Sequence, residues 1–399
     1  MKKFIVATII SIFIVFGVFE IITMPKEDSE LISEDNVAKI DEPIIPDDIT
    51  IHMTVGGDVL CHNTNFWDAY DASTGTYDFS YSFEDIKKYF DNADIAIGTL
   101  ETNFAGKSVG YSNYPLFNSP EALATDLREL GFDILATGNN HCLDKGFSGM
   151  VSTLNELDMA GIEHMGTYAT EEASQQYLIK DVNGIKMAFL NYTYGTNGIP
   201  VPKGKEFAVN FIDKDKIKHD IDSVKEIGID VICVNMHWGE EYRLTQTKQQ
   251  EELADFLFQN GVDLILGSHT HCLEPMEKRT VVLEDGTEKD GFVIYSLGNF
   301  MSGQKAENSR QSVILDIQLT KSGETGKISI DQVKYTPTYM FNFYNSRQLK
   351  RFKVMDIEAE IEKYEAGDTS IGASMYNTLK KELENVYKVL GDEIITEDM

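Results

Sequence analysis

Positive charge is scarce in this sequence. The 399 residues include 35 lysines and arginines against 65 aspartates and glutamates, which gives a formal net charge of −30 at pH 7. Nucleic-acid-binding proteins need a basic surface, so this balance excludes nucleic acid as a partner. An acidic excess fits a solvated extracellular surface with a site that concentrates cations. An acidic surface that serves solubility alone is the alternative.

Cysteine is also scarce, and its four copies are scattered: Cys61, Cys142, Cys233 and Cys272. Small secreted domains that depend on disulfides are dense in cysteine, so this spacing excludes a disulfide framework. It also excludes a structural zinc site built mainly from thiolates. One pairing stays open, because Cys142 and Cys272 each directly follow a histidine discussed below and could lie close together in the fold.

The N-terminal residues 1–24 are hydrophobic. After Lys2 and Lys3 come sixteen uncharged residues, Phe4 to Phe19. If Glu20 lies at the interface, the segment is long enough to span a bilayer. The following residues offer neither a small-x-small cleavage site nor a lipobox-like cysteine. We therefore expect an uncleaved single-pass anchor in the cell membrane, with a cleaved signal peptide as the alternative. The two lysines predict a cytoplasmic N-terminus and an extracytoplasmic remainder.

Residues 25–50 have the composition of a flexible linker. Nine acidic residues, two lysines and three prolines lie between Pro25 and Asp48. Low hydrophobicity with high charge disfavours a packed structure. We expect one large domain over residues 51–345 and a charged, helical C-terminal extension over residues 346–399.

From residue 51 onward, short apolar runs alternate with helix-like segments. The runs at 93–101, 132–140 and 262–271 are apolar without alternation, which indicates strands that are buried on both faces. Asn183-Gly184 and Asp285-Gly286 each separate two strand-like runs and predict hairpins. The pattern predicts the α/β class, with βαβ units and added antiparallel strands.

Polar residues that can bind metal ions follow the strand-like runs. In open α/β sheets, ligands bind beyond the carboxyl ends of the strands. His269 and His271 can face one point, because residues two apart on a strand share a side. The set in chain order is Asp58, His62, Glu101, Asn139, Asn140, His141, Asp144, His237, Glu240, His269, His271 and Asn299.

Each of these residues alone has an ordinary structural interpretation, such as a turn or a helix cap. Their recurrence at successive strand ends favours a metal site. A mixture of imidazole, carboxylate and amide oxygen suits Mn, Fe, Zn or similar divalent ions. Two carboxylates with three or four imidazoles can hold one or two ions that activate a water. His141 is a candidate general acid, with Asp144 as its orienting partner.

The order of these motifs resembles the CapA family of bacterial poly-γ-glutamate capsule synthesis proteins. The motifs are GGDV, LETN, GNNHCLDKG, HWGEEY, GSHTH and YSLGNF, and they lie between about Ile51 and Met301. That family is itself similar to calcineurin-like metallophosphoesterases. The resemblance implies a four-layer α/β/β/α sandwich with two mixed sheets, beside an N-terminal transmembrane helix.

The resemblance also implies roles by position. Six residues match metal ligands: Asp58, Glu101 in the bridging position, Asn140, His237, His269 and His271. The catalytic candidates are His141, Asp144 and Glu240. Candidates for contacting the substrate or supporting the ligands are His62, Asn139 and Asn299.

The chain departs from the phosphoesterase pattern in its first motif. That motif normally reads D-x-H, and here Leu60 occupies the histidine position. The bridging residue, Glu101, is one methylene longer than the usual aspartate. One metal subsite therefore loses a ligand unless His62 or a water replaces it. A single ion held by the other subsite is the alternative to a pair.

For function, the resemblance implies a metal-dependent hydrolase or transferase that acts on a phosphoester or an amide bond. Its expected role is capsule or poly-γ-glutamate assembly, export or wall attachment, within a capsule synthesis complex. The expected partner is an anionic polymer, either poly-γ-glutamate or a wall glycopolymer, and a charge of −30 fits such a partner only if bound cations offset it. A non-catalytic scaffold or export component is the alternative, favoured by Leu60 and opposed by the retention of His141. A cytosolic phosphatase would require residues 1–24 to be soluble.

Overall fold

The computed structural model describes residues 46–283, 285–344, 350–391 and 395–396. The expected anchor and all but the last residues of the expected linker lie outside this part. Within it, no helix combines the length and the apolar character needed to cross a membrane.

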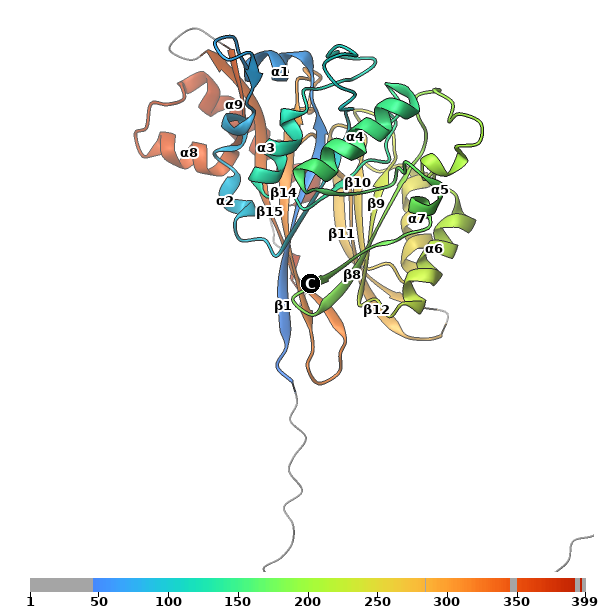
Figure 1. The fold of residues 1–399 in the computed structure, drawn as a ribbon. Coiled ribbons are helices and arrows are strands. Elements are labelled where there is room, and N and C mark those ends of the chain that lie inside the picture. Colours follow the sequence, from blue (N-terminus) through green and yellow to red (C-terminus); the bar gives the residue numbers. More distant parts are fainter. Residues whose placement is uncertain (1–45, 284, 345–349, 392–394, 397–399) are drawn as a thin grey trace, which may run out of the picture. The chain divides into compact units, whose positions relative to one another are not determined.

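Two mixed sheets form the centre of the fold (Figure 1). The first has the strand order β16-β15-β14-β1-β4-β5-β6, with β13 beside β1 and β17 beside β15. Its strands are β1 (Ile49–Leu60), β4 (Ile95–Leu100), β5 (Ile134–Ala136), β6 (Glu163–Met165), β13 (Met301–Ser302), β14 (Gln311–Lys321), β15 (Ile328–Tyr344), β16 (Lys350–Asp356) and β17 (Ile395–Thr396). Strand β1 runs antiparallel to β14 and parallel to β4.

The second sheet has the order β11-β12-β10-β9-β8-β7. Its strands are β7 (Leu178–Val182), β8 (Ile185–Thr193), β9 (Val231–His237), β10 (Leu264–Ser268), β11 (Leu273–Val282) and β12 (Glu288–Leu297). Strands β8, β9, β10 and β12 are parallel, and the outer strands β7 and β11 are antiparallel to their neighbours. A small separate sheet pairs β2 (Tyr70–Asp71) with β3 (Thr76–Tyr77).

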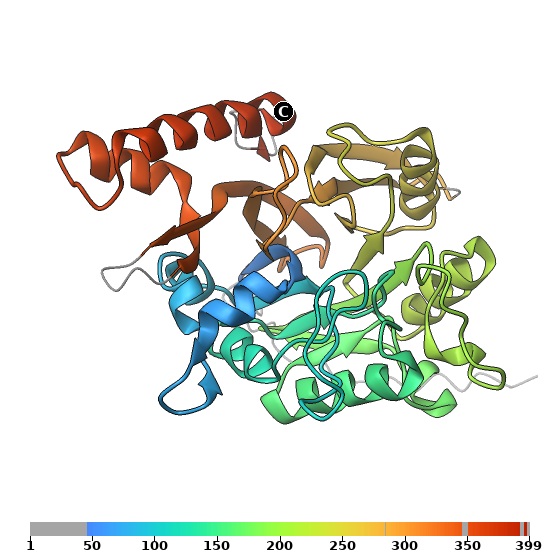
Figure 2. The ribbon, with the colours of Figure 1, turned by 90° about the horizontal axis from the view of Figure 1, so that it is seen from above.

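Helices cover the outer faces of the two sheets (Figures 1 and 2), whereas α9 (Ala373–Leu390) contacts strands of both sheets. The other helices are α1 (Asn63–Ala69), α2 (Lys87–Phe90), α3 (Ala122–Leu130), α4 (Gly146–Ala160), α5 (Glu171–Ser174), α6 (Lys214–Glu226), α7 (Lys248–Gln259) and α8 (Ile357–Glu365). Two short 3-10 helices are η1 (Ser80–Phe83) and η2 (Glu206–Ala208). The predicted α/β fold with two mixed sheets is confirmed.

Three apolar clusters hold the layers together. One lies between the sheets and includes residues from both, such as Val55, Ile97, Phe189 and Leu266. A second joins the first sheet to α3 and α4, and a third joins the second sheet to α6 and α7. Burial of this apolar surface is the main driving force for such packing, and it fixes each strand end relative to its neighbours.

Local sequence signals explain several boundaries. Thr247 and Gln250 form a reciprocal capping box at the start of α7. The Asn183-Gly184 turn has positive φ at both residues, 53° and 101°, as a two-residue hairpin turn requires. Where one helix is expected over residues 82–90, the chain instead forms the end of η1 and the single-turn helix α2.

The C-terminal segment contains more than helices. Strand β16 pairs antiparallel with β15, and α8 and α9 follow it. Val386 and Leu390 of α9 belong to the apolar cluster between the sheets. The segment expected as an extension therefore contributes to the main core.

Candidate metal centre

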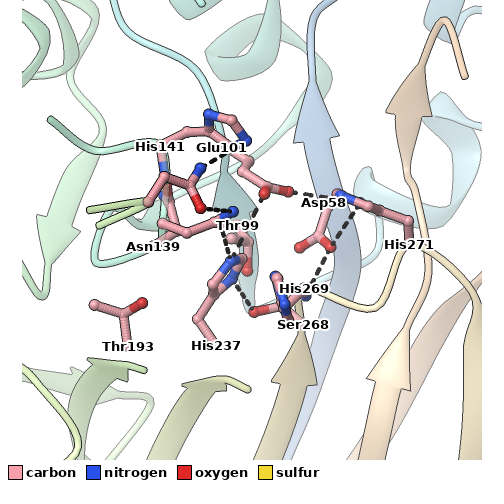
Figure 3. Close-up of polar contacts among 12 residues, drawn as sticks. Asp58, Thr99, Glu101, Asn139, His141, Thr193, His237, Ser268, His269 and His271 are labelled. Atoms are coloured by element: carbon pink, nitrogen blue, oxygen red, sulfur yellow. Dashed lines mark hydrogen bonds and ion pairs between the residues drawn. The ribbon is translucent and has the colours of Figure 1, made fainter. Parts of the chain in front are cut away.

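Two carboxylates and three histidines meet where the C-terminal ends of β1 and β4 lie close to those of β9 and β10 (Figure 3). Asp58 lies near the end of β1, and Glu101 directly follows β4. His237 ends β9, and His269 and His271 follow β10. All five residues are buried. The first sheet thus supplies the carboxylates, and the second supplies the imidazoles.

Their ligand atoms form two groups that share Glu101. One contains Glu101, His237 and His269, and the other contains Asp58, Glu101 and His271; within each group the atoms lie within 4.8 Å of one another. Glu101 Oε1 is 3.6 Å from His237 Nε2, and Glu101 Oε2 is 3.8 Å from His271 Nδ1. Asp58 Oδ2 is 4.0 Å from His271 Nδ1. One carboxylate could therefore bridge two ions.

Several polar atoms of this cluster have no hydrogen-bond partner among the described residues. They are Asp58 Oδ1, both carboxylate oxygens of Glu101, and His269 Nδ1. Burying such atoms without hydrogen bonds is costly, and buried charges are normally paired or bind metal. The unpaired oxygens and nitrogen therefore fit divalent cations well.

The protonation states agree with this fit. Burial raises the pKa of Asp58 to about 7. Burial, and then repulsion from Asp58, Glu241 and Asp144, raises the pKa of Glu101 well above its ordinary value. Burial also lowers the pKa of His269 to about 4 and that of His271 to about 3. At neutral pH the imidazoles are thus uncharged and have a free lone pair, as metal binding requires.

An amide oxygen, that of Asn140, faces the same point as His237. Asn140 Oδ1 lies 2.6 Å from His237 Nε2, and Asn140 Nδ2 donates to Asn197 Oδ1 at 3.3 Å. His237 Nδ1 lies 2.9 Å from Ser268 Oγ, whose hydroxyl donates to Met236 O. In that arrangement His237 donates from Nδ1, so its Nε2 lone pair points at the oxygen of Asn140. The Asn140 oxygen and the His237 nitrogen are thus close enough to bind the same cation.

His141 and Asp144 form a buried pair beside the cluster. His141 Nδ1 is 2.8 Å from Asp144 Oδ2, which also accepts from the backbone N–H of Phe117 at 2.7 Å. The ring of Phe117 packs edge-on against His141 at 4.8 Å. On the other side, His141 Nε2 is 3.4 Å from Asn197 Nδ2. Asp144 therefore fixes the ring, and Nε2 is the nitrogen available for proton transfer.

The remaining predicted residues have different surroundings. Asn139 donates to the carbonyls of Leu100 and Thr137, so it ties strand ends together. Asn299 Oδ1 lies 3.1 Å from His271 Nδ1, the same nitrogen that faces Asp58 and Glu101. His62 Nδ1 is engaged with the backbone of Leu60 and Gly303, and the imidazole is in neither metal group.

Glu240 is not brought into the cluster. Its carboxylate pairs with Arg243 at 3.0 Å, and the side chain is 66% exposed. The charge of the next residue, Glu241, contributes to the raised pKa of Glu101. The four cysteines are free thiols, so the Cys142–Cys272 pairing that the sequence left open is not formed in the structure.

Sequence reasoning missed three residues at the site. Tyr194 packs on His269 with ring centroids 4.5 Å apart, and Tyr242 lies 6.0 Å from His271. Asn197 contacts both Asn140 and His141. Tyr194 directly follows β8, so the rule of reading strand ends could have found it; the loop residues Asn197 and Tyr242 had no such signal.

Strained backbone is concentrated at the site. Positive φ values occur at His269 (98°), His271 (60°), Tyr242 (65°) and Asn197 (50°). Residues with a Cβ avoid this region, and such outliers gather at functional sites. The strained residues therefore include two of the candidate ligands, His269 and His271, and two residues that contact the site.

An α/β protein with two mixed sheets and a buried candidate site for two metal ions is the class that the fold and the site define. The chain belongs to the family described as "Bacterial capsule synthesis protein PGA_cap", whose model matches residues 52–304. The predicted membership of the CapA family is thereby confirmed.

Curated relatives agree with this family. The chain is 28% identical to the PGA biosynthesis protein CapA of Bacillus subtilis over 268 residues, which are 63% of this chain and 64% of the relative. It is 26% identical to the capsule biosynthesis protein CapA of Bacillus anthracis over 260 residues, 62% of this chain and 60% of the relative. The match thus spans less than two thirds of the length of these relatives.

Solved structures show a weaker similarity. The calcineurin-like phosphoesterase YfkN from Bacillus subtilis aligns with a TM-score of 0.45 at 16% identity, covering 86% of this chain and 98% of that chain. The NAD nucleotidase NadN of Haemophilus influenzae aligns with a TM-score of 0.49 at 15% identity, covering 86% and 64%.

Proposed function

We propose that this protein is a metal-dependent hydrolase or transferase of the cell envelope that acts in capsule or poly-γ-glutamate biosynthesis. The observation that carries the proposal is the buried Glu101, whose two unpaired oxygens face separate groups of ligands. The names of the CapA relatives support the biological role. The hydrophobic residues 4–19 support a membrane anchor with the domain outside the cytoplasm.

The residues divide into two proposed ion sites. Glu101, His237, His269 and Asn140 would hold one ion, and Asp58, Glu101 and His271 would hold the other. When bound, such ions activate a water and stabilise negative charge on the group under attack. The second site lacks the histidine that usually follows Asp58, because Leu60 stands in its place and His62 is engaged with backbone atoms. We therefore propose a firm first site and a weaker second site.

His141 has the role of proton donor to the leaving group in this proposal. Asp144 accepts from Nδ1 and keeps the ring in one orientation, so a proton on Nε2 faces the reacting group. Ser268 performs a similar service for His237, because it holds Nδ1 and directs Nε2 to the ion. The scissile bond is a phosphoester or an amide, since both reactions need an activated water and a stabilised oxyanion.

Metal binding and turnover of the full-length chain in detergent test this proposal together. The metal content is measured by mass spectrometry after loading with Mn²⁺, Fe²⁺ or Zn²⁺. Turnover is measured with bis-p-nitrophenyl phosphate, p-nitrophenyl phosphate and γ-glutamyl-p-nitroanilide. We expect bound metal, and a His141→Ala variant that keeps the metal and turns over roughly 10²- to 10⁴-fold more slowly. Asp144→Asn should also keep the metal and lose at least about tenfold in rate.

His219→Ala is the matched control, because His219 is an exposed residue of α6. It should change neither metal content nor rate. A wild-type chain that binds none of the three ions would disprove the proposal. Bound metal without turnover of any substrate, unaffected by added partner proteins, would favour the scaffold function, which the incomplete second ion site supports.

A further inference from the structure

Two half-exposed tyrosines lie over the buried histidines of the centre. The ring of Tyr194 is 4.5 Å from that of His269 and tilted by 49°, and the ring of Tyr242 is 6.0 Å from that of His271 and tilted by 44°. The tyrosines are 47% and 45% exposed, whereas the two histidines are almost fully covered. A substrate that approaches the histidines therefore meets these aromatic side chains first.

Folding alone gives little reason for Tyr242 at its position. Its φ of 65° is unfavourable for a residue with a Cβ. Its N–H donates to Thr270 O at 2.8 Å, and Gln304 Nε2 donates to its phenol oxygen at 3.3 Å. The chain thus fixes an unfavourable backbone in order to present an aromatic ring that stays half in solvent. Such a conformation is characteristic of functional positions.

The other tyrosine, Tyr194, packs against His237 and His269. Tyr194 lies nearly parallel to His237, with ring centroids 6.3 Å apart, and its hydroxyl bonds to the side chain of Asn140.

Cations do not compensate the negative charge of the centre. Among the described residues, the ion pairs of Asp58, Glu101 and Asp144 are all with histidines. The loop that carries Tyr242 contains Arg243, but this residue pairs with Glu240 at the surface. A ligand with many carboxylates would find no positive side chain in these contacts.

We propose that Tyr194 and Tyr242 are substrate-binding residues that recognise a sugar ring attached to the phosphoryl group under attack. Aromatic faces contact the C–H face of a pyranose, and the phenol hydroxyls with the amides of Asn197 and Gln304 can bond its hydroxyls. The inference rests on the proposed function, because it names the substrate class of that same site. It favours a sugar phosphoester over a bare polyglutamate chain.

Binding of matched probes tests the inference without turnover. The full-length His141→Ala chain, loaded with Mn²⁺, is titrated calorimetrically with glucose 1-phosphate and with ethyl phosphate, which has the same phosphate group and no ring. We expect glucose 1-phosphate to bind about tenfold more tightly. Adding Tyr194→Ala or Tyr242→Ala should reduce this preference roughly three- to tenfold each, as the loss of one aromatic contact predicts. The phenylalanine variants should keep most of it.

Tyr70→Ala is the matched control, because Tyr70 is equally exposed, at 46%, and lies on β2. It should leave the preference unchanged. Equal binding of the two phosphates, or alanine variants without effect, overturns the sugar assignment and leaves the metal centre intact. Adenosine 5′-monophosphate binding tenfold more tightly than glucose 1-phosphate overturns it in favour of a planar base. If the Mn²⁺-loaded chain binds none of these probes, phosphoester chemistry itself fails.

Discussion

Asp58 is the residue at which protons and a metal ion compete near neutral pH. Its pKa is raised to about 7 by burial, whereas the pKa values of His269 and His271 are lowered to about 4 and 3. A metal ion must displace the proton from the carboxyl group, but the imidazoles carry none in this range. At pH 8 the carboxylates are free to bind a metal ion, whereas at pH 6 protons partly occupy them.

We therefore expect the affinity for Mn²⁺ to fall as the pH decreases from 8 to 5. The slope should approach about tenfold per pH unit for each proton displaced once the pH is below 7. Calorimetric titration at pH 8, 7, 6 and 5 measures it. Asp58→Asn should weaken the second ion site and flatten part of the slope, and Glu101, whose pKa is also raised, should account for the rest. An affinity that stays constant from pH 8 to 6 would contradict this assignment.

At the scale of single elements, the strand ends could be predicted and the loops could not. Glu101, His237 and His269 were found because each lies at or directly after the last residue of a buried strand. Periodicity determines where such a strand ends. The loop after β9 has no periodicity, so nothing in HWGEEY told which carboxylate faces the site. The motif predicts Glu240 as a catalytic candidate, but its carboxylate pairs with Arg243 at the surface, and it is the charge of Glu241 that contributes to the raised pKa of Glu101.

The end of β1 shows how an element places a ligand. The pairing of β1 with β4 shifts register between Val55 and Asp58, at Gly56-Gly57. Such an irregularity redirects the side chain that follows. A Cβ on Gly57 would lie 2.1 Å from the carbonyl oxygen of Gly298, which accepts the N–H of Asp58 at 2.9 Å. Glycine at 57 thus lets the two sheets approach where Asp58 enters the site.

Gly57→Ala should therefore push β1 away from the chain after β12. We expect a loss of roughly 1–3 kcal/mol in the free energy of unfolding, the usual cost of overpacking, and weaker binding at the ion site that contains Asp58. Urea unfolding and Mn²⁺ titration measure the two effects. Gly195→Ala is the control, because a Cβ there meets nothing within 4 Å. Equal stability of the two variants would contradict the close approach.

At the scale of the whole domain, the site depends on how two sheets are joined, and sequence patterns do not encode that. Asn235 on β9 donates to Thr99 on β4 at 3.2 Å and accepts from Asn191 on β8 at 3.1 Å. This buried amide network lies between the sheets and had no signal in the sequence. The family resemblance supplied the two-sheet arrangement, which alternation of elements alone would not have distinguished from one sheet.

The start of β1 also determines where a truncated chain should begin. The strand begins at Ile49, and Asp58 lies nine residues further along, roughly 30 Å at 3.3 Å per residue. Strand β1 thus begins at the end of the sheet opposite the metal centre (Figure 1). Asp48 accepts the N–H of Gly323 at 2.8 Å, so a truncated chain should begin at Pro46 and not at Thr50.

Ions at this centre would connect the two sheets, because each candidate group combines a carboxylate of the first sheet with imidazoles of the second. Removing them leaves buried carboxylates facing one another without a counter-ion, and repulsion from Asp58 already contributes to the raised pKa of Glu101. We therefore expect chelation to lower the melting temperature by several degrees. Ions present at a hundred times Kd should stabilise the native state by about 2.7 kcal/mol.

Calorimetry of the full-length chain with EDTA and with Mn²⁺ measures the difference. Glu101→Gln should abolish most of it, since both groups lose their shared ligand, whereas His219→Ala should preserve it. Identical melting temperatures with and without Mn²⁺ would show that the sheets are held by their apolar core alone.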